Sequence, residues 1–167
     1  TFIKRLILFF ISKIRMYYHK KMLNVQKWQK LKNINNGGTI FILGNGPSLN
    51  LTPIYLLKNQ DVFCFNGFNH MLNRINWVPK YYMVTDDLVA FDLKEDIPKM
   101  VKYVDKAFFP LIHPSNKSFY KFIQDRENIF WLDAGYPNFR KDLPKCGINN
   151  TVINASIQIA IFMGYKN

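Results

Sequence analysis

The chain has 167 residues, of which 49% are hydrophobic and 16% aromatic, so it can build a sizeable core and is not intrinsically disordered. Its formal net charge of +12 is unevenly placed: residues 1–33 hold nine Lys and Arg and no Asp or Glu, whereas the remainder has a net charge of only +3. Two cysteines, Cys64 and Cys146, are too few for a disulfide scaffold and fit no zinc-binding spacing, so we expect a cytoplasmic protein.

Residues 1–36 are expected to form a basic, amphipathic helical arm. The apolar run Leu6–Ile11 has six residues, whereas a membrane-spanning helix needs about 20. Aromatic and aliphatic side chains among Lys and Arg favour a helix lying on an anionic membrane surface, although packing of the arm on the domain explains the same pattern. We expect no nucleic-acid partner, since a basic arm alone is not specific for one. The turn Asn35–Gly38 separates this arm from a domain over residues 37–167.

The domain begins with the uncharged run Thr39–Leu43, which predicts a short strand buried on both faces. A tight polar turn follows, made of Gly44, Asn45, Gly46, Pro47 and Ser48. Glycines let a ligand approach the main chain closely, and open α/β sheets bind ligands where their strands end. The turn matches neither a Walker loop nor the dinucleotide fingerprint, because no Lys follows Gly46 and Leu49 stands where the third Gly would be.

Two further predicted strands end in polar residues. Residues 61–65 lead into Asn66-Gly67, and residues 81–85 lead into Asp86-Asp87. Because the carboxyl ends of parallel strands share one edge of a sheet, the three polar ends predict a ligand site there. The alternative is that these strand ends are ordinary turns that bind no ligand, since such turns have the same composition.

The remaining chain alternates helices and strands. We expect helix within 89–104 and over 115–124, strands over 107–111 and 128–132, and a surface loop over 133–148. A final helix over 151–163 should be capped by Asn149 or Asn150, with Ala155, Ile159, Ala160 and Met163 on its buried side and Gly164 ending it. The fold class is α/β, a Rossmann-like, mostly parallel sheet with flanking helices. A strand would follow next, so we expect a fragment of a longer chain.

Asp86 and Asp87 are candidate ligands of a divalent metal such as magnesium, since carboxylate oxygens suit hard cations. Of the two, Asp86 lies nearer to the strand end and is also the tentative catalytic residue. The alternative is that one Asp caps the next helix and the other is solvated. His70 and His113 lie in separate segments and are interpreted as structural or exposed.

Several of these segments together resemble one superfamily: G-N-G-P-S-L after a strand, P-K-Y-Y-M-V-T-D-D, and T-V-I-N-A-S-I-Q-I-A-I-F-M-G-Y-K. It contains the bacterial sialyltransferases that build lipooligosaccharide and the 6-hydroxymethylpterin diphosphokinase (MptE)-like proteins of polysaccharide biosynthesis clusters. The resemblance implies a nucleotide-binding domain in which the Gly44–Ser48 turn, Asn66 and Thr151 contact the nucleotide. Asn149 and Val152 stand where the sialyltransferases have Arg and Ser, and the family's catalytic His falls after residue 167.

Within this superfamily, the stretch Pro79–Asp87 is more similar to the diphosphokinase-like branch than to the sialyltransferases. The basic, aromatic arm favours a glycosyltransferase that uses a nucleotide-activated sugar and a glycan acceptor to build bacterial surface polysaccharide or lipooligosaccharide, because the acceptors of surface glycans lie on membranes. The basic arm would hold it at the inner face of the membrane. A diphosphokinase-like transferase using ATP and magnesium is the first alternative. A non-catalytic nucleotide-binding module is the second.

Overall fold

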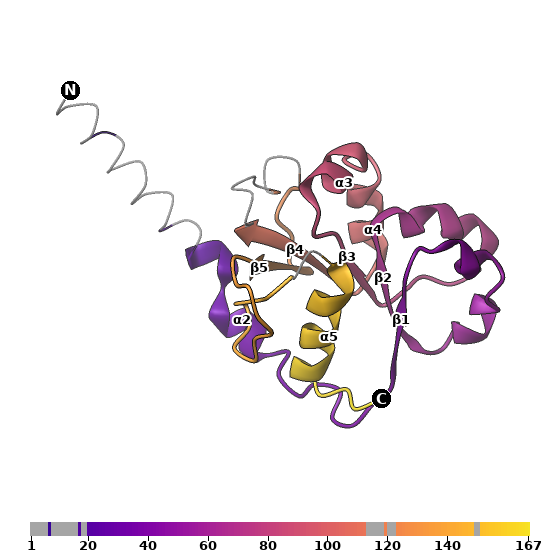
Figure 1. The fold of residues 1–167 in the computed structure, drawn as a ribbon, viewed down its shortest axis with the longest axis horizontal. Coiled ribbons are helices and arrows are strands. Elements are labelled where there is room, and N and C mark those ends of the chain that lie inside the picture. The colour runs from indigo at the N-terminus through magenta and orange to yellow at the C-terminus, as the bar shows by residue number, and fades with distance from the viewer. Residues whose placement is uncertain (1–6, 8–16, 18–19, 113–118, 120–122, 149–150) are drawn as a thin grey trace.

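The computed structural model describes residues 7, 17, 20–112, 119, 123–148 and 151–167. Its centre is a parallel sheet in which the spatial order of the strands follows the chain (Figure 1). The α/β class and the parallel sheet predicted from the sequence are therefore confirmed. The strands are β1 (Ile40–Leu43), β2 (Asp61–Phe65), β3 (Tyr81–Met83), β4 (Lys106–Ile112) and β5 (Ile129–Asp133).

The connections between strands and the two remaining helices cover opposite faces of the sheet. One face packs against the crossover segments, which contain three 3-10 helices, η1 (Pro47–Asn50), η2 (Ile54–Leu57) and η3 (Asn66–Arg74), and two α-helices, α3 (Asp87–Asp92) and α4 (Ile97–Tyr103). The other face packs against α2 (Val25–Gln29) and α5 (Val152–Phe162), which Figure 1 shows beside the sheet. The described chain is thus a three-layer α/β/α arrangement.

An aromatic row crosses the sheet on the face that α2 and α5 cover. Phe63 of β2 lies opposite Tyr81 of β3, and Phe108 of β4 lies opposite Phe130 of β5. Ring centroids along the row are 5.4 Å apart for Phe63 and Phe108 and 5.6 Å apart for Phe108 and Phe130. These four side chains are almost fully buried, which explains why the corresponding runs read as continuous apolar strands.

β1 departs from the expected burial on both faces. It pairs only with β2 among the described strands, so it forms an edge of the sheet, and Phe41 is 37% exposed. A short apolar run predicts a strand from its composition, but its position in the sheet depends on the topology of the whole chain.

α5 begins and ends close to the predicted positions, but its cap differs from the expected one. Thr151 is the N-cap, and its hydroxyl accepts a hydrogen bond from the Ile153 N–H at 3.3 Å. Asn149 and Asn150 lie outside the described residues. Ala155, Ile159, Ala160 and Met163 are buried as predicted, and Gly164 ends the helix with a φ of +92°, a conformation that glycine adopts without strain.

The end of the arm packs on the domain. Trp28 of α2 is fully buried, donates a hydrogen bond from its indole Nε1 to the Trp131 carbonyl at 3.1 Å, and contacts the rings of Phe130 and Phe162. Leu31 is buried in the same cluster. Residues that the sequence assigns to the arm therefore contribute to the core, which agrees with the alternative in which the arm packs on the domain.

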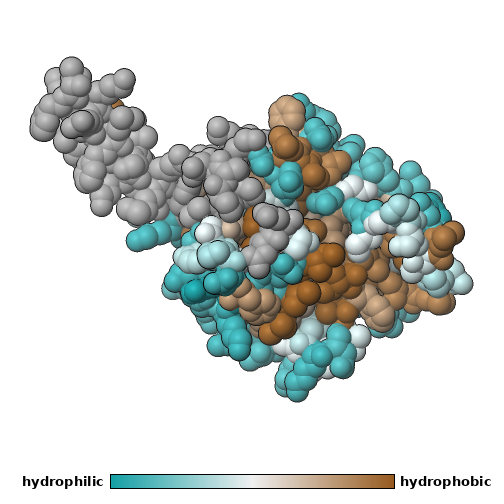
Figure 2. Space-filling view, viewed as in Figure 1, coloured by the Kyte–Doolittle hydropathy of each residue, from teal (hydrophilic) through white to brown (hydrophobic). Residues whose placement is uncertain are grey.

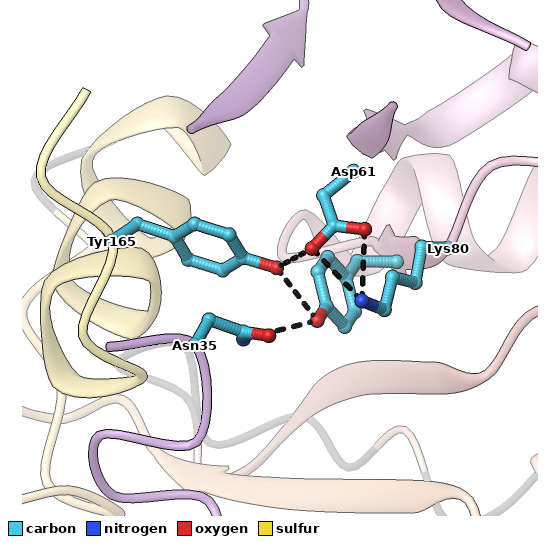
Figure 3. A network of polar contacts seen from close by, with 5 residues as sticks. Asn35, Asp61, Lys80 and Tyr165 are labelled. Atoms are coloured by element: carbon cyan, nitrogen blue, oxygen red, sulfur yellow. Dashed lines mark hydrogen bonds and ion pairs between the residues drawn. The ribbon is translucent and has the colours of Figure 1, made fainter. Parts of the chain in front are cut away.

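A polar network joins the last residues of the chain to the amino ends of β2 and β3 (Figure 3). Asp61 accepts hydrogen bonds from the Tyr165 hydroxyl and from Lys80 Nζ, the latter at 2.8 Å. The Tyr165 and Tyr81 hydroxyls are 2.9 Å apart, and Asn35 donates to the Tyr81 hydroxyl at 3.4 Å. This network lies at the edge of the sheet opposite the carboxyl ends of the strands.

Most of the segment 133–148 is a loop, but it is not the surface loop that the sequence predicts, because Ala134, Leu143, Cys146 and Ile148 are buried in the core. The buried side chain of Gln158 on α5 fixes it. The Gln158 amide exchanges hydrogen bonds with the backbone of Gly147 and accepts one from the Arg140 N–H at 2.9 Å. The predicted helix over 115–124 lies largely outside the described residues. Within the part of the chain that the structure describes, no helix has both the length and the apolarity needed to cross a membrane.

Candidate functional site

A hollow of 390 Å³ opens at the carboxyl edge of the sheet, between the turn after β1 and the segment after β2. This is the edge where the polar strand ends predicted a site. The residues that line the hollow are Asn45, Gly46, Pro47, Leu49, Asn50, Gly67, Phe68, His70 and Met71. Of the predicted nucleotide-binding residues, Asn45, Gly46 and Pro47 line it directly.

Asn45 joins the two sides of this hollow. Its side-chain Nδ2 donates a hydrogen bond to the Phe65 carbonyl at the end of β2, at 2.7 Å. Pro47 then lies in the first turn of η1. The N–H groups of a helix's first turn have no partner within the helix, so the missing N–H of proline costs no hydrogen bond there. The turn is therefore tied to the neighbouring strand, and the Oδ1 of Asn45 remains the acceptor that a bound molecule could use.

Asn66 adopts a left-handed conformation, with a φ of +47°, directly after β2. Its main-chain carbonyl accepts a hydrogen bond from the buried Tyr82 hydroxyl at 2.8 Å. Its side-chain Oδ1 is buried and has no hydrogen-bond partner among the described residues. A buried acceptor without a donor costs free energy, so this atom is a natural place for a ligand donor. The next residue, Gly67, lines the hollow.

The rim of the hollow carries polar groups that the sequence analysis did not assign to a site. The Arg74 guanidinium bonds both the side chain and the carbonyl of Asn50, which holds a cation beside the rim. His70 lines the opening and is exposed. Asn50 and Arg74 come from consecutive crossovers, 24 residues apart, so only the fold reveals that they meet.

The wall of the hollow is apolar, whereas its rim carries polar and charged groups. Leu49 and Phe68 are buried apolar residues of the wall, and Met71 packs against the same cluster. A planar heterocycle suits such a wall, while the amides of Asn45 and Asn50 suit the hydroxyl and carbonyl groups of a nucleoside. Arg74 is placed to meet a negatively charged group at the opening.

Asp86 is the N-cap of α3. Its Oδ1 accepts hydrogen bonds from the N–H groups of Leu88 at 2.8 Å and Val89 at 3.0 Å. Asp87 follows in the first turn of the helix and is half-buried. The described residues contain no group of three or more His, Cys, Asp or Glu side chains that could hold a metal. The two carboxylates alone would hold magnesium only together with phosphate oxygens of a substrate, which is the usual way Mg²⁺ is bound.

The other predicted nucleotide-binding residues, Gly44, Ser48, Asn66 and Thr151, do not line the hollow. Gly44 and Ser48 belong to the same turn, whose fourth and fifth residues start η1. Thr151 caps α5, and in Figure 1 this end of α5 faces the carboxyl edge of the sheet. The structure thus brings the turn and the segment after β2 together, while Thr151 serves first as a helix cap.

A second hollow, of 440 Å³, lies between α2 and the 133–148 loop and contains none of the predicted site residues. Lys32, Lys141 and Lys145 line it beside Asp142 and Asp133. Arg140 lowers the pKa of the Asp142 carboxyl to about 2 through a side-chain hydrogen bond. The mixed charges of this hollow give it no clear preference for one ligand.

Comparison of the chain with protein-family models, with curated proteins and with solved structures gives no match in any of the three. The residues of the site are therefore the only indication, from the structure and these comparisons, of what it could bind.

Proposed function

We propose that the protein is a nucleotide-binding transferase, and that it acts as a glycosyltransferase on a nucleotide-activated sugar in the synthesis of bacterial surface polysaccharide or lipooligosaccharide. The observation that carries the proposal is the hollow between the turn after β1 and the segment after β2. Its position at the carboxyl edge of a parallel sheet is where α/β folds bind nucleotides.

Three features of the site support a nucleotide over other small molecules. The wall of Leu49, Phe68 and Met71 is apolar, as a base requires. The amides of Asn45 and Asn50, which line the hollow, offer directed polar contacts. Asn66 does not line the hollow, but its buried Oδ1, one residue before Gly67, has no hydrogen-bond partner among the described residues. The third feature is Arg74, whose guanidinium is held by Asn50, a residue that lines the hollow, and brings a positive charge that could meet a phosphate group.

The glycosyltransferase proposal adds the resemblance to the bacterial sialyltransferases, in which the matching turn and the Asn after the second strand hold the donor nucleotide. The alternative, a diphosphokinase-like transferase, is favoured by Asp86 and Asp87 at the end of β3, on the same edge of the sheet. ATP and magnesium would then replace the nucleotide sugar. No general base is assigned to this chain.

Thermal-shift titrations of the protein with CMP, CDP, UDP, GDP and ATP, each with and without magnesium, test this proposal. We expect at least one nucleotide to raise the melting temperature in a saturable way, because a ligand that binds only the folded state stabilises it. A rise with a cytidine or uridine nucleotide that does not need magnesium favours the glycosyltransferase. A rise with ATP that EDTA abolishes favours the diphosphokinase-like enzyme.

The variant Asn66→Gly removes the unpartnered amide and keeps the left-handed backbone, which glycine adopts freely. We expect it to weaken nucleotide binding by about 1–3 kcal/mol, the usual loss for a buried hydrogen-bonding group. Asn33→Gly is the matched control, since Asn33 is also left-handed, with a φ of +57°, and lies outside this hollow. Equal affinities of the two variants, or no shift with any nucleotide at millimolar concentration, would contradict the proposal.

We further propose that the basic arm holds the enzyme at the inner face of the membrane, where the acceptors of surface glycans lie. Lys20, Lys21, Lys30 and Lys32 are exposed at the end of the arm. Lys27 is occupied instead, because its Nζ donates to the Ile129 carbonyl at 2.6 Å and lies over the Phe130 ring. Desolvation by burial lowers the pKa of Lys27.

A further inference from the structure

The side of α5 that faces away from the sheet is apolar. The helix contains no charged residue, and its sheet-facing side is buried. On the outer side, Ile153, Ile157 and Ile161 recur every four residues, so they form one row, the α5 row, and they are 40%, 37% and 50% exposed. Figure 2 shows hydrophobic side chains in the middle of this face, where Figure 1 places α5. A helix that is hydrophobic on all sides is normally covered on all sides, so the row indicates an interaction surface.

A hollow of 270 Å³ lies at the carboxyl-terminal end of the α5 row. Ile161 lines it together with Phe139, which is 46% exposed, so the hollow continues the apolar row. Three cationic side chains also line it: Lys32, Arg140 and Lys141. No acidic side chain of the described chain lines this hollow, since its other lining residues are Asn33, Gln158 and Phe162. The row of isoleucines therefore ends beside a patch of positive charge.

Two of these cations can meet an external anion. Arg140 is engaged, because its Nη2 lies 2.8 Å from Asp142 Oδ2, and the same carboxylate lies 3.5 Å from Lys145 Nζ. Lys32 and Lys141 are exposed and form no ion pair with any residue that the structure describes. Their charges are therefore uncompensated within the described chain.

The surface of an anionic bilayer matches both parts of this face. It places acyl chains next to phosphate groups, and segments that lie in a membrane interface combine an apolar side with Lys and Arg beside it. A second copy of the chain would match the α5 row alone, because it carries the same cations and the same net charge of +12. Charge complementarity therefore favours lipid over self-association.

We propose that the α5 row and this hollow form a lipid-docking surface on the domain itself, whose ligand is the anionic phospholipid of a bilayer. Lys32 and Lys141 contact lipid phosphates, while the isoleucines of the row contact acyl chains just below the headgroups. The surface is distinct from residues 1–19 and does not depend on the membrane role proposed for them. It shares no lining residue with the hollow proposed for the nucleotide, so nucleotide titrations test that function separately.

A fluorescent label on α5 tests the docking surface directly. The full-length variant Ile157→Cys is labelled with the environment-sensitive dye NBD, which should not react with the buried Cys64 and Cys146. On phosphatidylcholine vesicles that contain phosphatidylglycerol, we expect the emission to rise severalfold and to be quenched by doxyl-labelled lipid. The control is Phe91→Cys, at a side chain 58% exposed on α3, which covers the other face of the sheet; its label should stay in water. Ile153→Cys provides a second position if the first variant lowers the melting temperature.

A pair of lysine substitutions tests the cationic part of the surface. Replacing Lys32 and Lys141 together by Gln should weaken binding to the anionic vesicles by about tenfold or more, because basic residues near such a surface are attracted to it. Replacing Lys58 and Lys102 by Gln removes the same charge from the segments after η2 and on α4, which lie on the other side of the sheet. This control pair should change the binding much less.

The same label separates this surface from the arm. In a chain with Lys4, Arg5, Lys13 and Arg15 replaced by Gln, the label at residue 157 should still respond, at a higher lipid concentration. A chain that binds vesicles while this label stays in water would show that the arm alone anchors it, and would overturn the proposal. Equal effects of the two lysine pairs would also overturn it. So would a label that is protected in a dimer formed without vesicles, since a second copy would then cover the α5 row.

Discussion

Tyr165 links the end of the chain to the sheet through its hydroxyl group. The hydroxyl donates to Asp61 and lies 2.9 Å from that of Tyr81 (Figure 3). Desolvation by burial, with added contributions from the hydrogen bonds to Asp61 and Tyr81, raises the pKa of Tyr165 well above its usual range. The neutral phenol is therefore stabilised in the folded protein more than in the unfolded chain.

We expect Tyr165→Phe to lower the free energy of unfolding by about 1–3 kcal/mol at neutral pH, because the half-buried Asp61 loses a donor. A raised pKa stabilises the folded state below the unfolded value of about 10 and loses that contribution as pH rises above it. The difference between wild type and variant should accordingly shrink above that pH. Urea unfolding from pH 7 to 11 measures both effects. Tyr103→Phe, at a side chain 56% exposed, is the control and should change little at any pH.

At the scale of elements, α2 has only five residues and cannot be stable alone, so its side-chain packing must hold it. Trp28 supplies that packing through the rings of Phe108, Phe130 and Phe162. We expect Trp28→Ala to cost about 3–5 kcal/mol, as for other large buried side chains, and Trp28→Phe to cost less. Val25→Ala, on the same helix and 54% exposed, should be nearly neutral. Similar midpoints for Trp28→Ala and Val25→Ala in urea would show that α2 does not depend on this contact.

Helices and strands could be predicted from the sequence where a local pattern of residues determines them. β2 has the predicted bounds 61–65 because D-V-F-C-F is short, apolar and followed by a polar turn. The burial of Trp28 was not predictable, because its partners lie about a hundred residues further along the chain. The same reason applies to the site: the turn after β1 has a local signature, whereas Arg74 reaches Asn50 only through the fold.

At the scale of the whole molecule, basic charge and globular domain are separated along the chain. We expect the full chain to bind vesicles that contain anionic lipid, and a chain lacking residues 1–19 to bind less, because each basic residue near such a surface contributes about 1 kcal/mol. Binding should weaken as salt rises. Deletion through residue 36 is not a suitable comparison, since it would also remove the buried Trp28 and Leu31.

Co-sedimentation with vesicles of varied anionic content measures this difference. Neutral vesicles are one control, and a full-length chain with Lys4, Arg5, Lys13 and Arg15 replaced by Gln is the other. Equal pelleting of the full and shortened chains on anionic vesicles would refute the membrane role of the arm.

The order of the strands also affects how the protein folds as the ribosome synthesises it. Each strand pairs with the one made just before it, so the sheet and the crossovers on one face can assemble progressively from the amino-terminal side. The aromatic row on the opposite face stays partly uncovered until α5, the last helix, has emerged. Trp28 can already contact Phe108 at that stage, so a nascent chain that has completed β5 mainly presents Phe63 and Tyr81 to its surroundings. Chaperones would protect the chain most at this stage.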